Sequence, residues 1–442
     1  MGSVPEGRSF MNRQDEIKYD EAESLWKNRE AIPTPVRGSV ALSAALFLLA
    51  CFAIPFSILN ENVAIVLWAA LTAGGYFFTR RTRGLVGLVI GASALGAILP
   101  AALLPLGVTY YPAVGAMIAA ACVGVCAGAH YQTVTRRYWV LPVLALAASA
   151  GAYVATGDLL VSAMALAILP AAILLGGATY LGEGATSAVC FATGGLLLCV
   201  GALVFAWVCR TYGAVTLELL RGLLAEWKEG FVLAQIQSRA DLIAMIDQQI
   251  AAAGEGANIS SMEALKSSLE SMMSDDMIRS SMDAIFDLLP ATLFLCCAIP
   301  AYLGQRLLNA AYDTNGMRAV VTLESETFTV SLAAAVIYVV SLALSLLPTG
   351  ENGFVSMVAA NLSLMLMPAL LILGVRAFRQ QLRARGKSGR RGAVIVLILF
   401  VLVATTGALY LGAFFGAYVR IMQAIGKKLK DKMNRGNGSG TP

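Results

Sequence analysis

Charged residues are scarce in this sequence. Only 13% of the 442 residues are Asp, Glu, Lys or Arg, whereas 58% are hydrophobic. A soluble domain usually carries about 25% charged residues. Apolar runs long enough to cross a bilayer as a helix, about 20 residues, recur along the chain. The composition therefore excludes a soluble globular domain and predicts an all-α, polytopic transmembrane helix bundle.

The residues that most enzymes and metal sites require are also few. The chain has one histidine, His130, and its eight cysteines include no Cys-x-x-Cys pair. Cys122 and Cys126 share one helix face, but packing is the commoner reason for this spacing. No HExxH, Walker A or GxSxG motif is present. We therefore expect no enzyme activity, no metal site and no cofactor, and we expect His130 to lie at the membrane interface.

Ionisable residues are missing from the middle of the apolar runs. Such residues usually mark proton relays and ion-coupled transport, so a proton-driven pump is disfavoured. The net charge of +5 comes mainly from two basic clusters without interleaved aromatic residues. These clusters fit membrane topology better than nucleic-acid binding.

The sequence contains eleven candidate spans. Their approximate ranges are 39–59, 62–79, 84–106, 110–131, 138–155, 158–181, 185–209, 284–305, 327–348, 353–375 and 393–416. Seven spans form an N-terminal bundle at 39–210, and four form a C-terminal bundle at 284–418. A polar tail at 1–38 precedes them, and a basic, disordered tail is expected at 419–442.

Lys and Arg residues predict the orientation, because they are enriched in cytoplasmic loops. Basic clusters follow the second, fourth and tenth spans, at 80–83, 136–137 and in the loop 376–391. An even number of crossings separates these loops, so all three lie on the cytoplasmic side together with the N-terminus. The expected location is a bacterial cytoplasmic membrane, with residues 211–283 outside. The basic tail at 419–442 conflicts with eleven spans, which place it outside too.

Residues 211–283 form a polar insert with eleven Asp or Glu and five Lys or Arg residues. Apolar side chains recur there every three or four residues, which predicts amphipathic helices. The first stripe comprises Leu217, Leu220, Leu224, Trp227 and Phe231. Such helices could cap the bundle, contact a partner or a second copy, or lie on the membrane surface. Their acidic character disfavours binding to anionic lipids.

Polar residues at the ends of spans form a candidate ligand site. Asn60 and Glu61 lie in the turn between the first two spans, and Tyr110 and Tyr111 begin the fourth span on the same side. Together they could line an outward-facing pocket with one charge, amide donors and aromatic walls. Alternatively, the turn caps a helix and the tyrosines belong to the aromatic belt of the interface. Asn361, inside the tenth span, is expected to bond between helices.

Five segments of the chain follow one another in a characteristic order. They are VRGSVALSAALFLLACFAIPF at 36–56, GYFFTRRTRG at 75–84, IFDLLPATLFLCCAIPAYLGQRLL at 285–308, and two apolar segments at 324–348 and 352–378. This order resembles the YybS-like family of uncharacterised bacterial membrane proteins. The chain departs from the family pattern by two extra spans and a more basic tail.

The resemblance implies a transport-related function. The first half of that family is thought to resemble the substrate-binding components of energy-coupling-factor transporters, which dock on a separate ATPase module. A small solute would then be bound from outside, without ATP hydrolysis by this chain. Ala41 and Ala45 match the small residues used for docking, a spacing that is also common in helix packing. The alternative is a non-transporting structural or assembly protein, which binds envelope proteins or associates with itself.

Overall fold

In a computed structural model, the described part of the chain comprises residues 37–79, 83–103, 111–252, 260–272, 274–314, 329–346, 353–384 and 406–437. Its regular elements are all helices, and no strand occurs among these residues. The prediction of an all-α fold is confirmed. The chain divides into two compact units: unit 1 is Met1–Phe286 with Cys296–Thr327, and unit 2 is Asp287–Leu295 with Phe328–Pro442.

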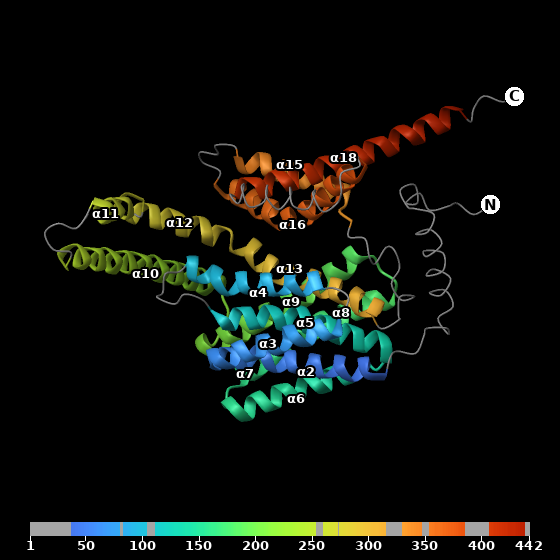
Figure 1. Cartoon of the computed structure of the whole chain (residues 1–442), viewed down its shortest axis with the longest axis horizontal. Helices are drawn as coiled ribbons and strands as arrows, with labels where there is room; N and C mark the ends of the chain where they lie inside the picture. The colour runs from blue at the N-terminus through green and yellow to red at the C-terminus, as the bar shows by residue number, and fades with distance from the viewer. Residues whose placement is uncertain are drawn as a thin grey trace. The chain divides into compact units, whose positions relative to one another are not determined.

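Unit 1 is a bundle of apolar helices from which a helical insert projects (Figure 1). The bundle helices are α2 (Arg37–Leu59), α3 (Glu61–Phe78), α4 (Arg83–Leu103), α5 (Pro112–Thr135), α6 (Val140–Thr156), α7 (Leu159–Ala163), α8 (Leu169–Tyr180) and α9 (Ala185–Tyr212), with the short 3-10 helix η3 (Met164–Leu166) before α8. Helix α13 (Leu289–Thr314) contributes its residues from Cys296 onward to the same unit.

Helix α5 is the centre of this bundle, because α2, α3, α4 and α8 all pack against it. Small residues make the close approach possible. A Cβ atom added at Gly124 would lie 2.5 Å from Ile168, the N-cap of α8, and 2.6 Å from Ala50 of α2. Cys122 and Cys126 are buried in this helix, which agrees with their interpretation as packing residues.

The contacts of α5 also fix the directions of its neighbours. Gly124 and Gly128 of α5 abut, in the same order, Ile168 at the N-cap of α8 and Ala172 within α8, so α5 and α8 run in parallel. The same two glycines abut Ala50 and then Phe47 of α2, which is therefore antiparallel to α5.

Further contacts show which helix ends lie together. Gly75 of α3 abuts Val123 of α5, and Phe78 of α3 contacts His130, so α3 is parallel to α5 and both begin at one end. We call this the hairpin end of unit 1, because α9 ends there and the insert follows directly. The turn after α5, with the exposed Arg136 and Arg137, lies at the opposite end.

The insert is a helical hairpin, which confirms the prediction of helices at 211–283. Helix α10 (Leu217–Ala252) runs outward, and α11 (Ser260–Met272) and α12 (Asp275–Asp287) return. Figure 1 shows these helices extending past the ends of the bundle helices, roughly along their direction. The hairpin therefore projects away from the bundle rather than folding back over its end.

Unit 2 contains α15 (Leu332–Leu346), α16 (Gly353–Ala384) and α18 (Thr406–Asn437), packed around Tyr338, Leu370 and Ala413. Helices α16 and α18 cross at glycines. A Cβ atom at Gly416 would lie 2.0 Å from the carbonyl oxygen of Leu370, and one at Gly374 would lie 2.5 Å from that of Gly412. These contacts pair later residues of one helix with earlier residues of the other, so α16 and α18 are antiparallel.

Asn361 bonds between helices, as predicted. Its Oδ1 accepts a hydrogen bond from the Ala291 backbone N–H at 3.0 Å, and its Nδ2 donates to the Asp287 carbonyl oxygen at 2.7 Å. Both partners belong to unit 2. The amide thus satisfies one backbone N–H at the start of α13 and one carbonyl at the end of α12, groups that the helices themselves leave without partners.

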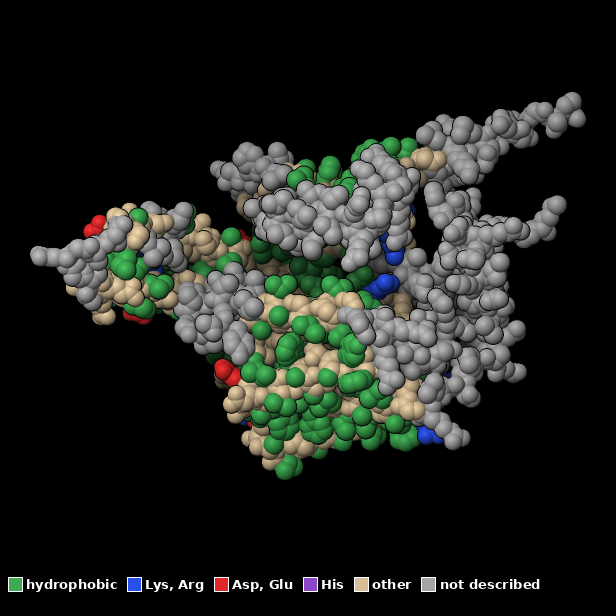
Figure 2. Space-filling view, in the orientation of Figure 1, with side chains coloured by type: hydrophobic (Ala, Val, Ile, Leu, Met, Phe, Trp, Pro, Cys, Tyr) green, Lys and Arg blue, Asp and Glu red, His purple; other side chains and the backbone are tan. Residues whose placement is uncertain are grey.

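The helices agree with the predicted spans. Eight helices in the described ranges are long and apolar enough to cross a membrane, and three shorter apolar helices lie at 84–97, 140–156 and 332–345. Each of the eleven predicted spans overlaps one of them. Figure 2 shows hydrophobic side chains spread over the exposed surface of the bundle in unit 1. The chain is therefore a multi-span membrane protein.

The end of the chain differs from the prediction. Residues 419–442 are expected to be disordered, but α18 continues as one helix to Asn437. The four Lys, two Arg and two Met residues of this segment favour helix, and no proline interrupts it before Pro442. The last apolar stretch is Leu409–Gly426. Residues 393–405 of the predicted eleventh span, and residues 1–36 of the N-terminal tail, lie outside the described residues.

Candidate functional site

Asn60 and Glu61 form a helix start. The Asn60 side chain is the N-cap of α3 and accepts hydrogen bonds from the backbone N–H groups of Asn62 at 2.8 Å and Val63 at 3.4 Å. Glu61 is exposed in the first turn, where a negative charge is favourable. The capping role, one of the two predicted alternatives, is confirmed.

One of the two tyrosines of the predicted pocket, Tyr111, belongs to the described residues. Tyr110 lies outside the described residues. Tyr111 is half-buried just before α5, and its backbone N–H donates to the Ala97 carbonyl oxygen of α4 at 2.7 Å. Its hydroxyl is buried and has no hydrogen-bond partner among the described residues. Tyr111 and Asn60 do lie at the same end of unit 1, since α3 and α5 are parallel.

His130 is buried inside the bundle, which was not predicted. Its side chain is 0% exposed. The ring meets Phe78 of α3 edge-on at 4.9 Å and stacks on Tyr312 of α13 at 5.6 Å. One turn later, Thr133 shares a hydrogen bond with the hydroxyl of Tyr312. These side chains link α3, α5 and α13, a role that hydropathy along the sequence could not reveal.

Gln132 lies on another side of α5 and faces α8. It is 2% exposed, and a Cβ atom added at Gly176 would be 3.0 Å from its Oε1. This Oε1 has no hydrogen-bond partner among the described residues. Buried polar atoms are normally paired, so the Oε1 of Gln132 is a buried acceptor with an unused hydrogen-bonding capacity among the described residues.

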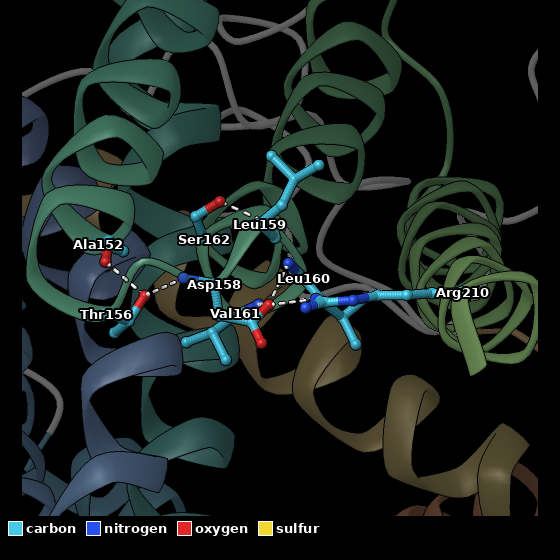
Figure 3. A network of polar contacts seen from close by, with 8 residues as sticks. All are labelled: Ala152, Thr156, Asp158, Leu159, Leu160, Val161, Ser162 and Arg210. Atoms are coloured by element: carbon cyan, nitrogen blue, oxygen red, sulfur yellow. Dashed lines mark hydrogen bonds and ion pairs between the residues drawn. The ribbon is translucent and has the colours of Figure 1, made fainter.

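A polar network closes the hairpin end of the bundle (Figure 3). Asp158 is the N-cap of α7 and accepts hydrogen bonds from the backbone N–H groups of Leu160 at 2.7 Å and Val161 at 3.3 Å. Its Oδ1 also accepts from Nη1 of Arg210 on α9 at 2.7 Å. The Arg210 hydrogen bond, followed by that of Leu160, holds the pKa of Asp158 below its usual range. The network joins two helices and needs no ligand.

The hairpin has an apolar core of its own. Val232 of α10 packs against Ile278 and Met282 of α12, with Phe231 and Ile285 beside them. Helix α10 therefore faces α12 with the side around Val232. Of the predicted stripe, only Phe231 takes part in this core.

Ion pairs join the hairpin helices outside this core. They are Lys228–Asp283 at 2.7 Å, Arg239–Asp275 at 2.6 Å, Lys266–Asp247 at 2.7 Å and Arg279–Glu229 at 3.0 Å. Hydrogen bonding to Asp247 and to Glu229, respectively, raises the pKa values of Lys266 and Arg279. Exposed pairs contribute little individually, but four of them fix how the helices align.

The predicted apolar stripe of α10 is divided between two environments. Phe231 packs inside the hairpin against Phe286, with ring centroids 5.9 Å apart. Leu217, Leu224 and Trp227 remain exposed, and Leu220 is half-buried. Three of the five residues are therefore available for contact with something other than the described chain.

Aromatic side chains gather where the hairpin meets the bundle. The ring of Trp207, near the end of α9, lies 5.7 Å from that of Trp227 and 6.1 Å from that of Tyr212. Trp and Tyr are enriched where helices leave a bilayer. This cluster therefore marks the level at which unit 1 would leave the hydrocarbon region.

Comparisons with known proteins give no relative. No protein-family model, no curated protein and no solved structure matches the chain. Among the described residues, no group of three or more His, Cys, Asp or Glu side chains could hold a metal ion. The exposed stripe of α10 and the buried polar groups of α5 are the features on which a function can be built.

Proposed function

We propose that this is a partner-binding protein of a bacterial cytoplasmic membrane. Its bundle of apolar helices anchors it in the bilayer, and its helical hairpin is presented on the outer side. The observation that carries the proposal is the exposed apolar stripe on α10. Soluble surfaces rarely keep such residues in a row without a contact to make. The outward location rests on Arg136 and Arg137, which lie at the opposite end of unit 1 and favour the cytoplasmic side.

The architecture of the hairpin supports this function. Its helices are already held together by the core around Val232 and by the ion pairs, so the exposed stripe is not needed to close the hairpin. A rigid helix that offers apolar side chains has a smaller entropic cost of binding than a flexible loop. Unit 1 supplies the anchor, and the hairpin supplies the contact surface.

Site-specific photocrosslinking in the native host tests the proposal. A photoreactive amino acid would replace Trp227 or Leu242 on the exposed side of α10, and Leu233 on the opposite side as the control. We expect one defined protein adduct from the first two positions, lost when Leu224 is changed to Ser, and none from the third. Crosslinks to lipid alone, or equal crosslinking at all three positions, would overturn the proposal.

A second candidate is the binding of a small solute, as the YybS-like resemblance implies. Two observations favour it: the buried Oε1 of Gln132 has no partner in the described chain, and Ala41 and Ala45 are exposed on α2 rather than packed inside. Native mass spectrometry of the protein purified mildly from its host tests this function. A bound small molecule that is lost in Gln132→Leu, or a copurifying ATPase module, would support it. A bare protein would count against it.

A further inference from the structure

Exposed apolar side chains recur on α10 beyond the predicted stripe, after a stretch in which Phe231 is half-buried and Gln235 is buried. Leu224 is 41% exposed and Trp227 is 47% exposed, and the pattern recurs at Leu242, 41% exposed, and Met245, 52% exposed. The second pair follows the first after 18 residues, which is five turns of an α-helix, so all four side chains lie on one side. We call these four residues the outer stripe.

Lipid cannot cover the whole outer stripe. Trp227 contacts Trp207, which lies five residues before the end of α9. Tryptophans are typical of the membrane interface, so we infer that Leu224 and Trp227 lie at that level. Leu242 lies fifteen residues further along α10, or about 22 Å at 1.5 Å per residue. Because the hairpin extends in the direction of the bundle helices (Figure 1), an interface at Trp227 puts Leu242 and Met245 about this distance beyond it. Their contact must come from the aqueous side.

Charge argues against a second copy of the hairpin on this surface. Residues 211–283 carry eleven acidic and five basic residues, a net charge of −6. Four of the five basic residues, Lys228, Arg239, Lys266 and Arg279, are already in ion pairs within the hairpin. Two such surfaces would repel each other, whereas a cationic surface would be attracted.

We propose that the outer stripe docks a cationic amphipathic helix of another protein, with apolar side chains against Leu242 and Met245 and Lys or Arg side chains toward the acidic surface of the hairpin. This inference rests on the proposed partner-binding function and specifies the partner. An apolar helix face laid on apolar side chains supplies affinity. The charges select the partner and speed the encounter.

A peptide-binding experiment on the full chain tests this inference. The protein would be placed in nanodiscs of zwitterionic lipid, with empty nanodiscs as the background. The probes are a labelled 18-residue amphipathic helix of Leu and Lys and the same sequence with Glu in place of Lys. We expect saturable binding of the Lys peptide, weaker binding at high salt, and binding of the Glu peptide weakened at least tenfold.

Variants of α10 separate docking from simple charge attraction. Leu242→Ser with Met245→Ser should weaken binding of the Lys peptide about tenfold or more, since two apolar contacts are lost. Leu233→Ser should leave binding unchanged, because Leu233 is exposed two and a half turns after Leu224, on the opposite face. Circular dichroism and melting of the variants show that the fold is retained.

The outcomes distinguish this inference from the function on which it rests. Equal binding of both peptides would overturn the proposal of a cationic partner. So would equal binding of the Lys peptide to the wild type and to the Leu242→Ser, Met245→Ser variant. The partner-binding function would still stand if Trp227 and Leu242 crosslink a protein in cells. If neither position crosslinks a protein in cells, the proposed partner-binding function is refuted, regardless of the result with the peptides.

Discussion

Arg210 and Asp158 are 52 residues apart in the sequence, yet Nη1 of Arg210 donates to Oδ1 of Asp158 at 2.7 Å. The same carboxylate caps the first turn of α7. The Asp158 side chain therefore caps α7 and also holds the end of α9, directly before the hairpin begins.

Replacement of Asp158 by Ala should lower the melting temperature of the protein, and the loss should depend on pH. Because folding lowers the pKa of Asp158, its stabilising effect is present above its ordinary pKa of about 3.9 and disappears as the pH falls through the folded-state value. Melting curves of wild type and variant between pH 7 and pH 3 should therefore converge on acidification.

Glu183→Ala is the matched control for this carboxylate, because Glu183 is an exposed acidic residue in the turn between α8 and α9. It should shift the melting temperature little at any pH. A constant difference between wild type and Asp158→Ala over the whole pH range would contradict an electrostatic role.

Gly416→Ala should destabilise unit 2. The added methyl group would meet the Leu370 carbonyl oxygen at 2.0 Å, and backbone atoms cannot move aside as a flexible side chain can. Overpacking of this kind typically costs about 1–3 kcal/mol. Gly426→Ala, in the same helix with open space around its Cβ position, should be neutral or slightly stabilising. Unfolding in mixed micelles measures both, and equal stability of the two variants would refute the close crossing.

Tyr312→Phe should weaken the contact between α5 and α13. The change removes the hydroxyl that bonds Thr133 but keeps the ring on His130. We expect a loss of about 0.5–1.5 kcal/mol in the free energy of unfolding. Tyr153→Phe, at an exposed tyrosine of α6, is the control. Equal effects of the two substitutions would mean that the interhelical hydrogen bond contributes nothing.

Arg279→Ala should loosen the hairpin without unfolding the bundle. Both terminal nitrogens of Arg279 bond the Glu229 carboxylate at 3.0 Å, a paired geometry that a single-point contact lacks. Hydrogen exchange should rise in α12 and stay constant in α5. Restoration by the exchanged pair, Arg279→Glu with Glu229→Arg, would show that pairing matters, and unchanged exchange in the single variant would rule it out.

The sequence predicted those features that depend on the local pattern of apolar residues. Long apolar runs located the spans, and a period of three to four residues located the helices of the insert. The capping role of Asn60 could be foreseen as one alternative, because the residues that complete a cap are adjacent in the chain. Such short-range signals need no knowledge of the tertiary packing.

Features that depend on distant partners could not be foreseen. The burial of His130 is decided by Phe78 and Tyr312, which come from other helices. Likewise, α12 selects the side around Val232 as the hairpin core, so that the predicted stripe of α10 is only partly covered. Periodicity shows that a face is apolar, but the neighbouring helix decides how much of that face remains free.

The contact between Trp207 and Trp227 gives the molecule a built-in optical reporter of its own movement. Two indoles whose centroids are 5.7 Å apart, one at the end of the bundle and one at the base of the hairpin, couple electronically when excited. A swing of the hairpin about its base would separate them and change both ultraviolet circular dichroism and fluorescence. Engagement of the hairpin could thus be followed in unlabelled protein.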